Sequence, residues 1–288
     1  MVDLQSQYQK IKNEVDEKVL NVMQSAMFIN GPEVQNFQKE LENYLDIKHV
    51  IPCANGTDAL QIALMALHLE PGDEVITADF TFAATVEVVH LLKLKSVLVD
   101  VDYDTFNIDI DKLKAAITPK TKAIIPVHLF GQCANMEAVL EVAKEHNLYV
   151  IEDNCQGIGA DYKFADGATK KSGTMGTLGV TSFFPSKNLG CYGDGGAIFT
   201  NDDDLAYKIR GIVNHGMYKR YYHDEVGVNS RLDSVQAAVL RVKLPLLDTY
   251  NAARRSAADY YDRAFANHPN ILTPKRAENS THVFHQYT

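Results

Sequence analysis

The sequence has few features of the protein classes that are easiest to recognise. Its 288 residues include four cysteines, none of them in a C-x-x-C pair, and ten histidines without metal-ligand spacing. Neither a metal site nor a disulfide framework is therefore indicated. No uncharged apolar run approaches the ~20 residues that span a bilayer, and the first residues lack the basic segment and apolar stretch of a signal peptide. We expect a cytoplasmic protein with reduced thiols, no bound metal and no membrane contact.

Basic residues are also in the minority. The chain has 28 Lys and Arg against 37 Asp and Glu, which gives a net charge of −9 and a pI near 5.5. A negative field disfavours non-specific binding to nucleic acid, so any anionic ligand must be held by local donors. No internal repeat or low-complexity segment is present. The length and the 46% hydrophobic content suffice for one large domain, or for one large and one small domain.

Apolar runs alternate with amphipathic segments in the middle of the chain. We predict strands over residues 50–54, 74–78, 96–101, 122–128 and 148–153, and helices after residue 57 and over 81–92, 109–117 and 136–146. Strands and helices that alternate at this spacing predict an α/β fold with a mostly parallel sheet flanked by helices on both faces. Ligands of such sheets bind at the carboxyl ends of the strands.

The two ends of the chain are predicted to be helical. Amphipathic helices are expected over residues 8–22, from Val34 to Leu45, and over 202–214, 232–247 (interrupted by Pro245) and 249–267. We therefore predict three parts. Residues 1–48 form a helical segment that packs on the main domain or on a partner subunit, residues 49–230 form a large α/β domain, and residues 231–288 form a helical linker and the start of a small C-terminal domain.

One lysine lies in an unusual setting. The β-prone run Val180-Thr-Ser-Phe-Phe-Pro-Ser-Lys187 carries it to the edge of a glycine-rich turn that ends at Gly196. Burying an ammonium group is unfavourable and lowers its pKa, which makes the amine a nucleophile toward a carbonyl. Lys187 is therefore a candidate for a Schiff base with an aldehyde cofactor. Considered alone, a strand-end lysine that points into water is the more common explanation.

Two segments are candidates for binding a phosphate. The segment Asn55-Gly56-Thr57-Asp58-Ala59 joins a predicted strand to a helix, where a glycine permits close approach and the free amides of the helix attract an anion. Ser182, shortly before Lys187, offers a second hydroxyl donor. The alternative for the first segment is an ordinary helix cap by Asn55 or Thr57, since it is neither a Walker motif nor a G-x-G-x-x-G motif.

Asp153 ends an apolar strand, where a carboxylate is desolvated unless a cation faces it. A protonated pyridine nitrogen is such a cation, and its protonation makes the ring an electron sink. Gln156 follows one turn later and can bond a ring oxygen, while Phe82, after the 74–78 strand, can stack on a planar ring. The alternatives are a turn cap for Asp153 and core packing for Phe82.

Further polar residues lie near the start of the 232–247 helix. Asn229 and Arg231 suit a carboxylate or phosphate ligand, although a helix cap with a surface salt bridge would use the same residues. Lys219 and Arg220 precede two tyrosines and could hold the phosphates of a nucleotide. A solvated loop is the simpler interpretation of that segment.

The order of these residues along nearly the whole chain resembles the DegT/DnrJ/EryC1/StrS family of sugar aminotransferases, which are pyridoxal-phosphate (PLP) enzymes of fold type I. The resemblance implies a seven-stranded, mostly parallel sheet and a Schiff base between Lys187 and PLP. It also implies that Asp153 binds the pyridinium nitrogen, Gln156 the ring hydroxyl and Phe82 the ring face, with the phosphate held by Gly56, Thr57 and Ser182. Asn229 and Arg231 would reach the site of a neighbouring subunit, so a homodimer with shared active sites is implied.

Within that family, the segments 181–201 and 226–233 look most like 3-aminotransferases of UDP-2-acetamido-3-keto-glucuronate. These enzymes use glutamate as donor, return 2-oxoglutarate, and serve bacterial surface-polysaccharide synthesis. Relatives that act on dTDP-3-keto- or 4-keto-6-deoxyhexoses share much of the same sequence in these segments. Members of the family usually continue past the position of Thr288, so the small C-terminal domain is expected to be incomplete here.

Two other functions remain open at this stage. A PLP-binding regulator on the same fold would keep Asp153 and Lys187 but would not react with glutamate. A nicotinamide-dependent enzyme would need a G-x-G-x-x-G motif after the first strand, and none is present. The histidine that replaces the lysine in related dehydratases is also absent, because position 187 is a lysine.

Overall fold

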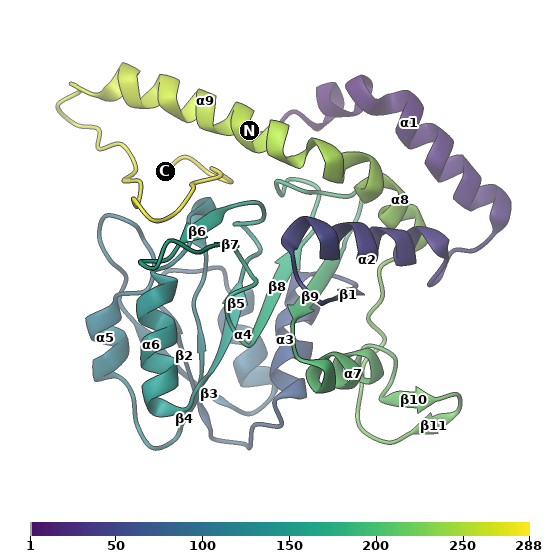
Figure 1. Cartoon of the computed structure of the whole chain (residues 1–288), viewed down its shortest axis with the longest axis horizontal. Coiled ribbons are helices and arrows are strands. Elements are labelled where there is room, and N and C mark those ends of the chain that lie inside the picture. The colour runs from purple at the N-terminus through teal and green to yellow at the C-terminus, as the bar shows by residue number, and fades with distance from the viewer. Residues whose placement is uncertain (1) are drawn as a thin grey trace. The chain divides into compact units, whose positions relative to one another are not determined.

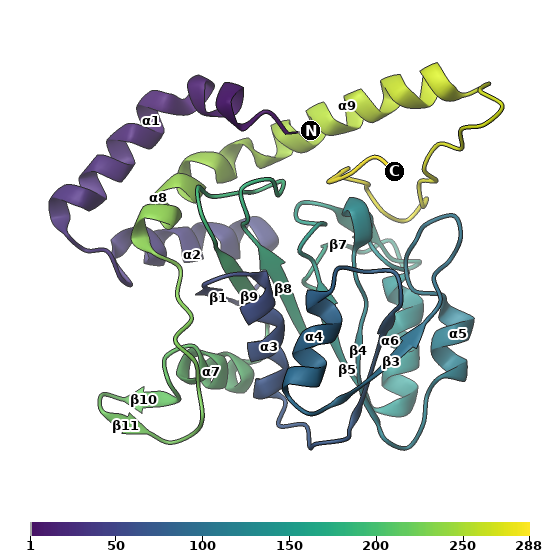
Figure 2. The same ribbon diagram turned by 180° about the vertical axis from the view of Figure 1, so that it is seen from behind.

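The computed structural model describes residues 2–288 and divides the chain into two compact units (Figures 1 and 2). The first unit comprises Met1–His68 and Val180–Leu247, and the second comprises Leu69–Gly179 and Asp248–Thr288. Each unit is therefore built from two segments that lie far apart in the sequence.

Three helices of the first unit pack side by side. They are α1 (Leu4–Ser25), α2 (Pro32–Leu45) and α8 (Ser234–Lys243), and both α1 and α2 lie against α8 (Figure 1). The side chain of Asp3 caps α1, and α2 begins at a proline, whose missing N–H is not needed in the first turn. Ile11 and Val15 of α1 pack against Val239 and Val242 of α8. The two helices predicted before residue 48 are thus present.

The first unit also contains strands of the seven-stranded sheet. These are β1 (His49–Cys53), β9 (Gly196–Thr200) and β8 (Leu178–Ser182), whose residues from Val180 onward belong to this unit. Strand β1 runs antiparallel to β9, with Cys53 opposite Gly196. Helices α3 (Gly56–Ala66) and α7 (Asp203–Ile212) pack on each other and on these strands. This arrangement places the residues after β1 and before β9 at one edge.

The second unit holds the parallel part of the sheet. Its strand order is β5 (Tyr149–Asp153), β4 (Thr121–Ile125), β2 (Glu74–Ala78) and β3 (Lys95–Val99). Helix α4 (Ala84–Leu91) covers one face, and α6 (Met136–His146) with α5 (Ile110–Ala115) lies on the other (Figures 1 and 2). Apolar residues of α6 and of the four strands β2, β3, β4 and β5 form one buried cluster. The predicted α/β fold with a mostly parallel sheet is confirmed.

Short elements and one long helix complete the two units. The first unit adds η2 (Leu244–Leu246) and the hairpin of β10 (Met217–Lys219) and β11 (Tyr222–His223). The second unit adds η1 (Leu129–Gly131), the hairpin of β6 (Asp161–Lys163) and β7 (Thr169–Lys171), and α9 (Leu247–Phe265), which starts at the last residue of the first unit. The interruption predicted at Pro245 occurs in η2, between α8 and α9.

Two features differ from the sequence-based expectations. The helix expected over 81–92 begins only at Ala84, so Phe82 lies in the loop before it. The segment from Lys219 to His223 is not a simple solvated loop, because it forms most of the β10–β11 hairpin. None of the helices in residues 2–288 is long and apolar enough to cross a membrane.

The second unit buries an acidic side chain directly before Asp153. Glu152 and His128 are both fully buried, and His128 Nε2 lies 2.8 Å from Glu152 Oε2. Because His128 Nδ1 accepts from the Ala134 N–H at 3.2 Å, we assign the ring proton to Nε2, which donates to the carboxylate. Three backbone N–H groups, those of Gly173, Met175 and Gly176, also donate to Glu152.

We expect His128→Ala to destabilise the protein by about 3 kcal/mol, because removing one partner leaves a buried carboxylate less well satisfied. Urea unfolding at neutral pH measures this cost. His146→Ala, at the exposed end of α6, is the matched control and should cost less than about 1 kcal/mol. Equal effects of the two substitutions would contradict the assigned role of the pair.

Candidate cofactor and active site

Lys187 lies in the loop that joins β8 to β9. The base of this loop is closed by hydrogen bonds from the Phe183 N–H to Gly195 O at 2.7 Å and from the Cys191 N–H to Phe183 O at 2.8 Å. Lys187 is half-buried, and its own N–H donates to Phe184 O at 2.8 Å. Within residues 2–288 its Nζ atom has no hydrogen-bond or ion-pair partner. The amine is therefore available to a ligand.

The start of α3 offers amide groups to an anion. The Asn55 side chain accepts from the Asp58 N–H at 2.8 Å, and Asn55 O accepts from the Ala59 N–H at 3.1 Å. The first two N–H groups of the helix, those of Gly56 and Thr57, have no partner within a helix that begins here. The predicted cap by Asn55 and the predicted phosphate turn are thus compatible, because they use different amides.

Glycine is required where β9 meets this turn. A Cβ atom on Gly196 would lie 2.4 Å from Asn55 O and 3.0 Å from Gly56 N. Both atoms belong to the backbone, so an added methyl group must displace the turn.

We therefore expect Gly196→Ala to weaken binding of the expected phosphate-bearing cofactor about tenfold or more, because strain of this size costs about 1–3 kcal/mol. A cofactor titration followed by absorbance measures the effect, with circular dichroism as a check of the fold. Unchanged affinity would show that this turn does not hold the cofactor.

Ser182 lies at the same edge of the sheet as this turn. The contact between Phe183 and Gly195 places the end of β8 beside the start of β9, and Cys53 at the end of β1 pairs with Gly196. Strands β8 and β1 are thus two strand spacings, about 10 Å, apart. Ser182 Oγ accepts from the Phe184 N–H at 3.2 Å, so its hydroxyl proton remains available as a donor. Phosphate donors from two segments distant in sequence therefore share one edge.

A residue that the sequence did not reveal fixes the loop before α8. Ser230 is fully buried, donates to Asp58 Oδ2 at 2.6 Å and accepts from the Ala54 N–H at 3.0 Å. Its neighbour Asn229 is exposed, and the side-chain oxygen of Asn229 accepts from the guanidinium of Arg231. The structure thus holds Asn229 and Arg231 next to the start of α3. A serine between two functional candidates carried no recognisable signal.

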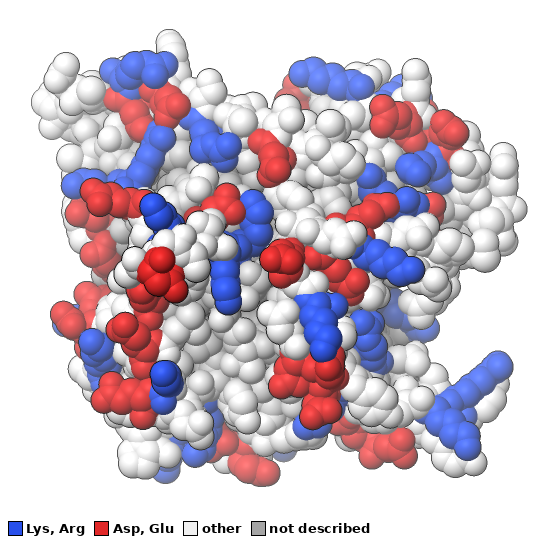
Figure 3. Space-filling view, viewed as in Figure 1, with Lys and Arg blue, Asp and Glu red and all other residues white. Residues whose placement is uncertain are grey.

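The basic candidates of the first unit lie on its surface. Arg231 is half-buried and, with Arg210, lines a cavity of about 260 Å³. Lys219 and Arg220 belong to the β10–β11 hairpin and lie over the rings of Tyr222 and Tyr221, at 4.9 and 5.0 Å from the ring centres. Positive charge is visible on this hairpin in Figure 3, whereas both signs are mixed over the rest of the face shown. These cations can therefore meet an anionic ligand only at the surface or across an interface.

Asp153 ends β5 in the second unit and is 5% exposed. Thr85 of α4 donates to its Oδ2 atom at 2.9 Å, and the Cys155 N–H donates to Oδ1 at 3.2 Å. No Lys, Arg or His of the described chain pairs with this carboxylate. A buried carboxylate held only by neutral donors favours a cationic ligand.

Thr85 carried no recognisable signal in the sequence. Its hydroxyl also lies 3.0 Å from that of Thr81, in the loop before α4. The only available signal was a pair of threonines four residues apart around Phe82, and such a pair has no specific meaning.

Gln156 and Phe82 also present groups to a ligand. Gln156 Oε1 accepts from the Phe130 N–H at 2.6 Å, so the amide NH₂ of Gln156 is left as a donor. Phe80 is engaged with Phe106 and Phe130, at ring distances of 5.8 and 6.2 Å. Phe82 is 69% exposed. Its ring is therefore the one available for stacking, and its predicted contact with a cofactor remains a prediction.

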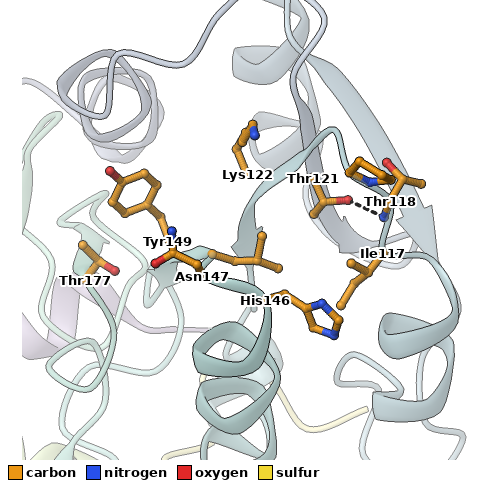
Figure 4. A pocket seen from close by; sticks show the side chains of 10 residues that line it. Ile117, Thr118, Thr121, Lys122, His146, Asn147, Tyr149 and Thr177 are labelled. Atoms are coloured by element: carbon orange, nitrogen blue, oxygen red, sulfur yellow. Dashed lines mark hydrogen bonds between the residues drawn. The ribbon is translucent and has the colours of Figure 1, made fainter.

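A cavity of about 800 Å³ in the second unit lies elsewhere (Figure 4). Thr121 and Tyr149, the first residues of β4 and β5, line it together with Lys122 and His146. It is thus at the amino ends of the strands, about 13 Å along β5 from Asp153. None of the predicted site residues lines this cavity, and ligands of parallel sheets bind at the opposite edge. We find no group of three or more potential metal ligands in residues 2–288.

Comparison with known proteins defines the class. The model of the DegT/DnrJ/EryC1/StrS aminotransferase family matches residues 9–288, and this chain belongs to that family. The chain is 50% identical over 287 residues to the UDP-2-acetamido-2-deoxy-3-oxo-D-glucuronate aminotransferase of Pseudomonas aeruginosa, covering 100% of this chain and 78% of that protein. It is 49% identical over 290 residues to the pleiotropic regulatory protein of Geobacillus stearothermophilus, covering 100% and 77%.

A solved structure supports the same classification. The structure of NtdA from Bacillus subtilis with bound cofactor PMP matches with a TM-score of 0.87 and 35% identity, over 96% of this chain and 63% of that chain. The family and fold expected from the sequence are thereby confirmed.

Proposed function

We propose that this chain is a PLP-dependent aminotransferase that moves an amino group from glutamate to a nucleotide-linked ketosugar, UDP-2-acetamido-3-keto-glucuronate. The observation that carries the proposal is the pair of unsatisfied charges. In the described part of the chain, Asp153 is a buried carboxylate without a cationic partner, and Lys187 is a half-buried amine without an anionic partner. Bound PLP supplies a carbonyl carbon for an amine and a protonated ring that accepts electrons.

The residues that would hold PLP fit its chemical groups. The Asp153 carboxylate would bond the ring nitrogen and keep it protonated, with Thr85 fixing the carboxylate. The free NH₂ of Gln156 would donate to the ring oxygen, and Phe82 would cover the ring face. The N–H groups of Gly56 and Thr57 and the hydroxyl of Ser182 would bind the phosphate. Asn229 would reach the phosphate of a neighbouring subunit.

Lys187 would have two successive duties. Its amine would hold the cofactor through the carbonyl carbon, and once released from it the amine would take up and return a proton as general base and acid. Because the Lys187 amine has no partner among residues 2–288, it could perform both duties without breaking an ion pair.

The basic residues support an anionic sugar nucleotide as substrate. The guanidinium of Arg231 suits a uronate carboxylate, and Lys219 and Arg220 suit a diphosphate. Because the chain carries a net charge of −9, these local cations must provide the attraction for such a substrate.

We propose a homodimer in which Asn229, Arg231 and the β10–β11 hairpin serve the partner's site. Exposed apolar side chains cluster at the end of α1 and in the following loop, and a contiguous patch of this kind is typical of an interface. They are Leu20, Met23, Met27, Phe28 and Ile29, which are 42–56% exposed. A cytoplasmic location is also proposed, since the buried thiols of Cys53, Cys133 and Cys191 form no disulfide.

The test is a pair of half-reactions. The purified protein should take up PLP with a yellow colour, lose that colour with glutamate, and regain it with UDP-2-acetamido-3-keto-glucuronate in a panel of UDP- and dTDP-ketosugars. Failure to take up PLP would end the proposal. Recovery only with a dTDP-ketohexose would identify the alternative substrate class.

A second candidate function is a PLP-binding regulator. The 49% identity to a protein named as a pleiotropic regulator favours considering it. Such a protein would bind PLP but would not react with glutamate, so the first half-reaction separates the two functions.

A further inference from the structure

A second lysine of the first unit lies in an unusual environment. Lys243, the last residue of α8, is 2% exposed. Its Nζ atom donates to Gly190 O at 2.7 Å and lies 4.3 Å from the centre of the Tyr192 ring. Both partners belong to the loop that carries Lys187. A carbonyl and an aromatic face therefore replace the carboxylate that a buried ammonium normally requires.

Helix α8 holds this loop at a second point. Gln236, two helical turns before Lys243 and hence on the same face of α8, accepts from the Tyr192 N–H at 2.9 Å. The loop itself is tightly folded, because a Cβ atom on Gly190 would lie 2.4 Å from Pro185 O and 2.8 Å from Phe184 O. A shift of the Gly190 backbone must therefore also move the backbone of Phe184 and Pro185, which lies beside Lys187.

We propose that Lys243 is a positioning residue, whose ammonium group holds the Gly190–Tyr192 part of the loop and thereby fixes the place of the Lys187 amine. The effect on reaction rate rests on the proposed function, whereas the effect on the loop does not. A methionine would fill the same space without the cost of burying a charge. The position therefore carries a charge at the expense of stability.

Burial lowers the pKa of Lys243 to about 8, and the thiol of Cys191 opposes this shift. The other ionisable groups around it are engaged with one another. On α2, Glu33 and Glu40 pair with Arg241 of α8. On α1, Tyr8 and Lys12 bond Asp16, and the ring of Tyr8 contacts that of Tyr192. Asp194, in the loop that carries Lys187, is exposed. None of these groups neutralises Lys243.

Deprotonation of Lys243 should loosen the loop that carries Lys187 but increase the free energy of unfolding of the whole protein. A neutral amine is a weaker donor and is not attracted to the Tyr192 ring, so the loop should loosen as pH rises through about 8. The ordinary pKa of 10.5 applies to the unfolded chain, which therefore binds more protons than the folded chain between about 8 and 10.5. Over that window the Lys243 contribution to the free energy of unfolding should rise.

Amide hydrogen exchange on the full chain at pH 7 and pH 9, corrected for intrinsic rates, tests the proposal. The N–H groups of Lys187 and Cys191, which bond Phe184 O and Phe183 O, report on the loop. In the wild type they should exchange about tenfold faster at pH 9 than at pH 7. In Lys243→Met they should be fast at both values, and in Lys243→Gln, which keeps a neutral donor, the pH step should disappear.

Matched variants separate positioning from packing. Gln236→Leu should loosen the loop but keep the pH step, and Lys39→Met, an exposed lysine of α2, should change neither. In urea at pH 7, Lys243→Met should unfold no earlier than the wild type, although its half-reaction with glutamate should be slower, with a smaller pH dependence between 7 and 9.

Unchanged exchange at Lys187 and Cys191 in Lys243→Met would overturn the proposal. So would faster exchange that extends equally to the core strand β4, because that result would indicate a purely structural role. If the wild type binds no PLP, the proposed function fails, but the exchange data still decide the role of Lys243.

Discussion

Replacing Lys187 by alanine is expected to give a folded protein that binds PLP only reversibly and reacts with glutamate about 10⁴-fold more slowly, near the upper limit of general acid–base catalysis. The side chain would supply both the attachment of the cofactor and the proton transfer. Because its Nζ atom has no partner in the described chain, its removal should leave the fold unchanged. Single-turnover absorbance with excess glutamate measures the rate.

The control is Lys122→Ala, which removes an exposed lysine from the cavity at the amino ends of β4 and β5. Its rate should equal that of the wild type. A Lys187→Ala protein that reacts with glutamate at more than about a tenth of the wild-type rate would show that another group moves the proton.

Asp153→Asn is expected to slow the same half-reaction by about 10²–10⁴-fold. Loss of a buried charge partner costs about 3–5 kcal/mol, and 1.36 kcal/mol corresponds to a factor of ten. The asparagine retains an oxygen for Thr85 and has nearly the same shape, so the change removes the charge and little else. The ring nitrogen would then lose its proton and the ring much of its capacity to accept electrons.

Stability provides an independent readout for this position. Without cofactor, Asp153 is a buried charge with only neutral donors, so Asp153→Asn should leave the PLP-free protein at least as stable as the wild type. Thr85→Val is the matched control. It keeps the charge but removes one hydrogen bond and should reduce the rate only about tenfold. Equal rates for Asp153→Asn and the wild type would contradict the role of Asp153 as ring partner.

The sequence predicted the sheet because its strands are short apolar runs separated by periodic helices. The run 74–78 and the helix 136–146 coincide with β2 and α6. The hairpins β6–β7 and β10–β11 were not predicted as strands, since they are short, largely exposed and rich in charged residues. Such strands depend on pairing with each other and carry little hydrophobic pattern.

The supporting contacts of the candidate site could not be predicted, because they join residues far apart in the sequence. Ser230 bonds Asp58 across a separation of 172 residues, and Thr85 bonds Asp153 across 68. A single serine or threonine gives no local signal for such a bond. The position of Asp153 at the end of β5 could be predicted, since a charged residue after an apolar run contrasts with its surroundings. The same contrast singled out Lys187, which lies in the loop after β8 and not at the end of the strand.

The domain boundaries expected at residues 48 and 230 remain predictions. The described chain groups residues 1–68 with 180–247, so the helices before residue 48 share a unit with the Lys187 loop. Sequence pattern alone does not report this grouping, because it arises from packing of α1 and α2 on α8.

The central proposal is that the amine of Lys187 and the carboxylate of Asp153 would serve one pyridine ring. Borohydride reduction of the PLP-loaded wild type, followed by peptide mapping, tests it most directly when repeated on Asp153→Asn. We predict a single pyridoxyl group on Lys187 in the wild type, and in the variant a label at the same lysine with a shifted absorbance of the bound cofactor. A label on any other lysine, or identical spectra before and after the Asp153 substitution, would contradict the account.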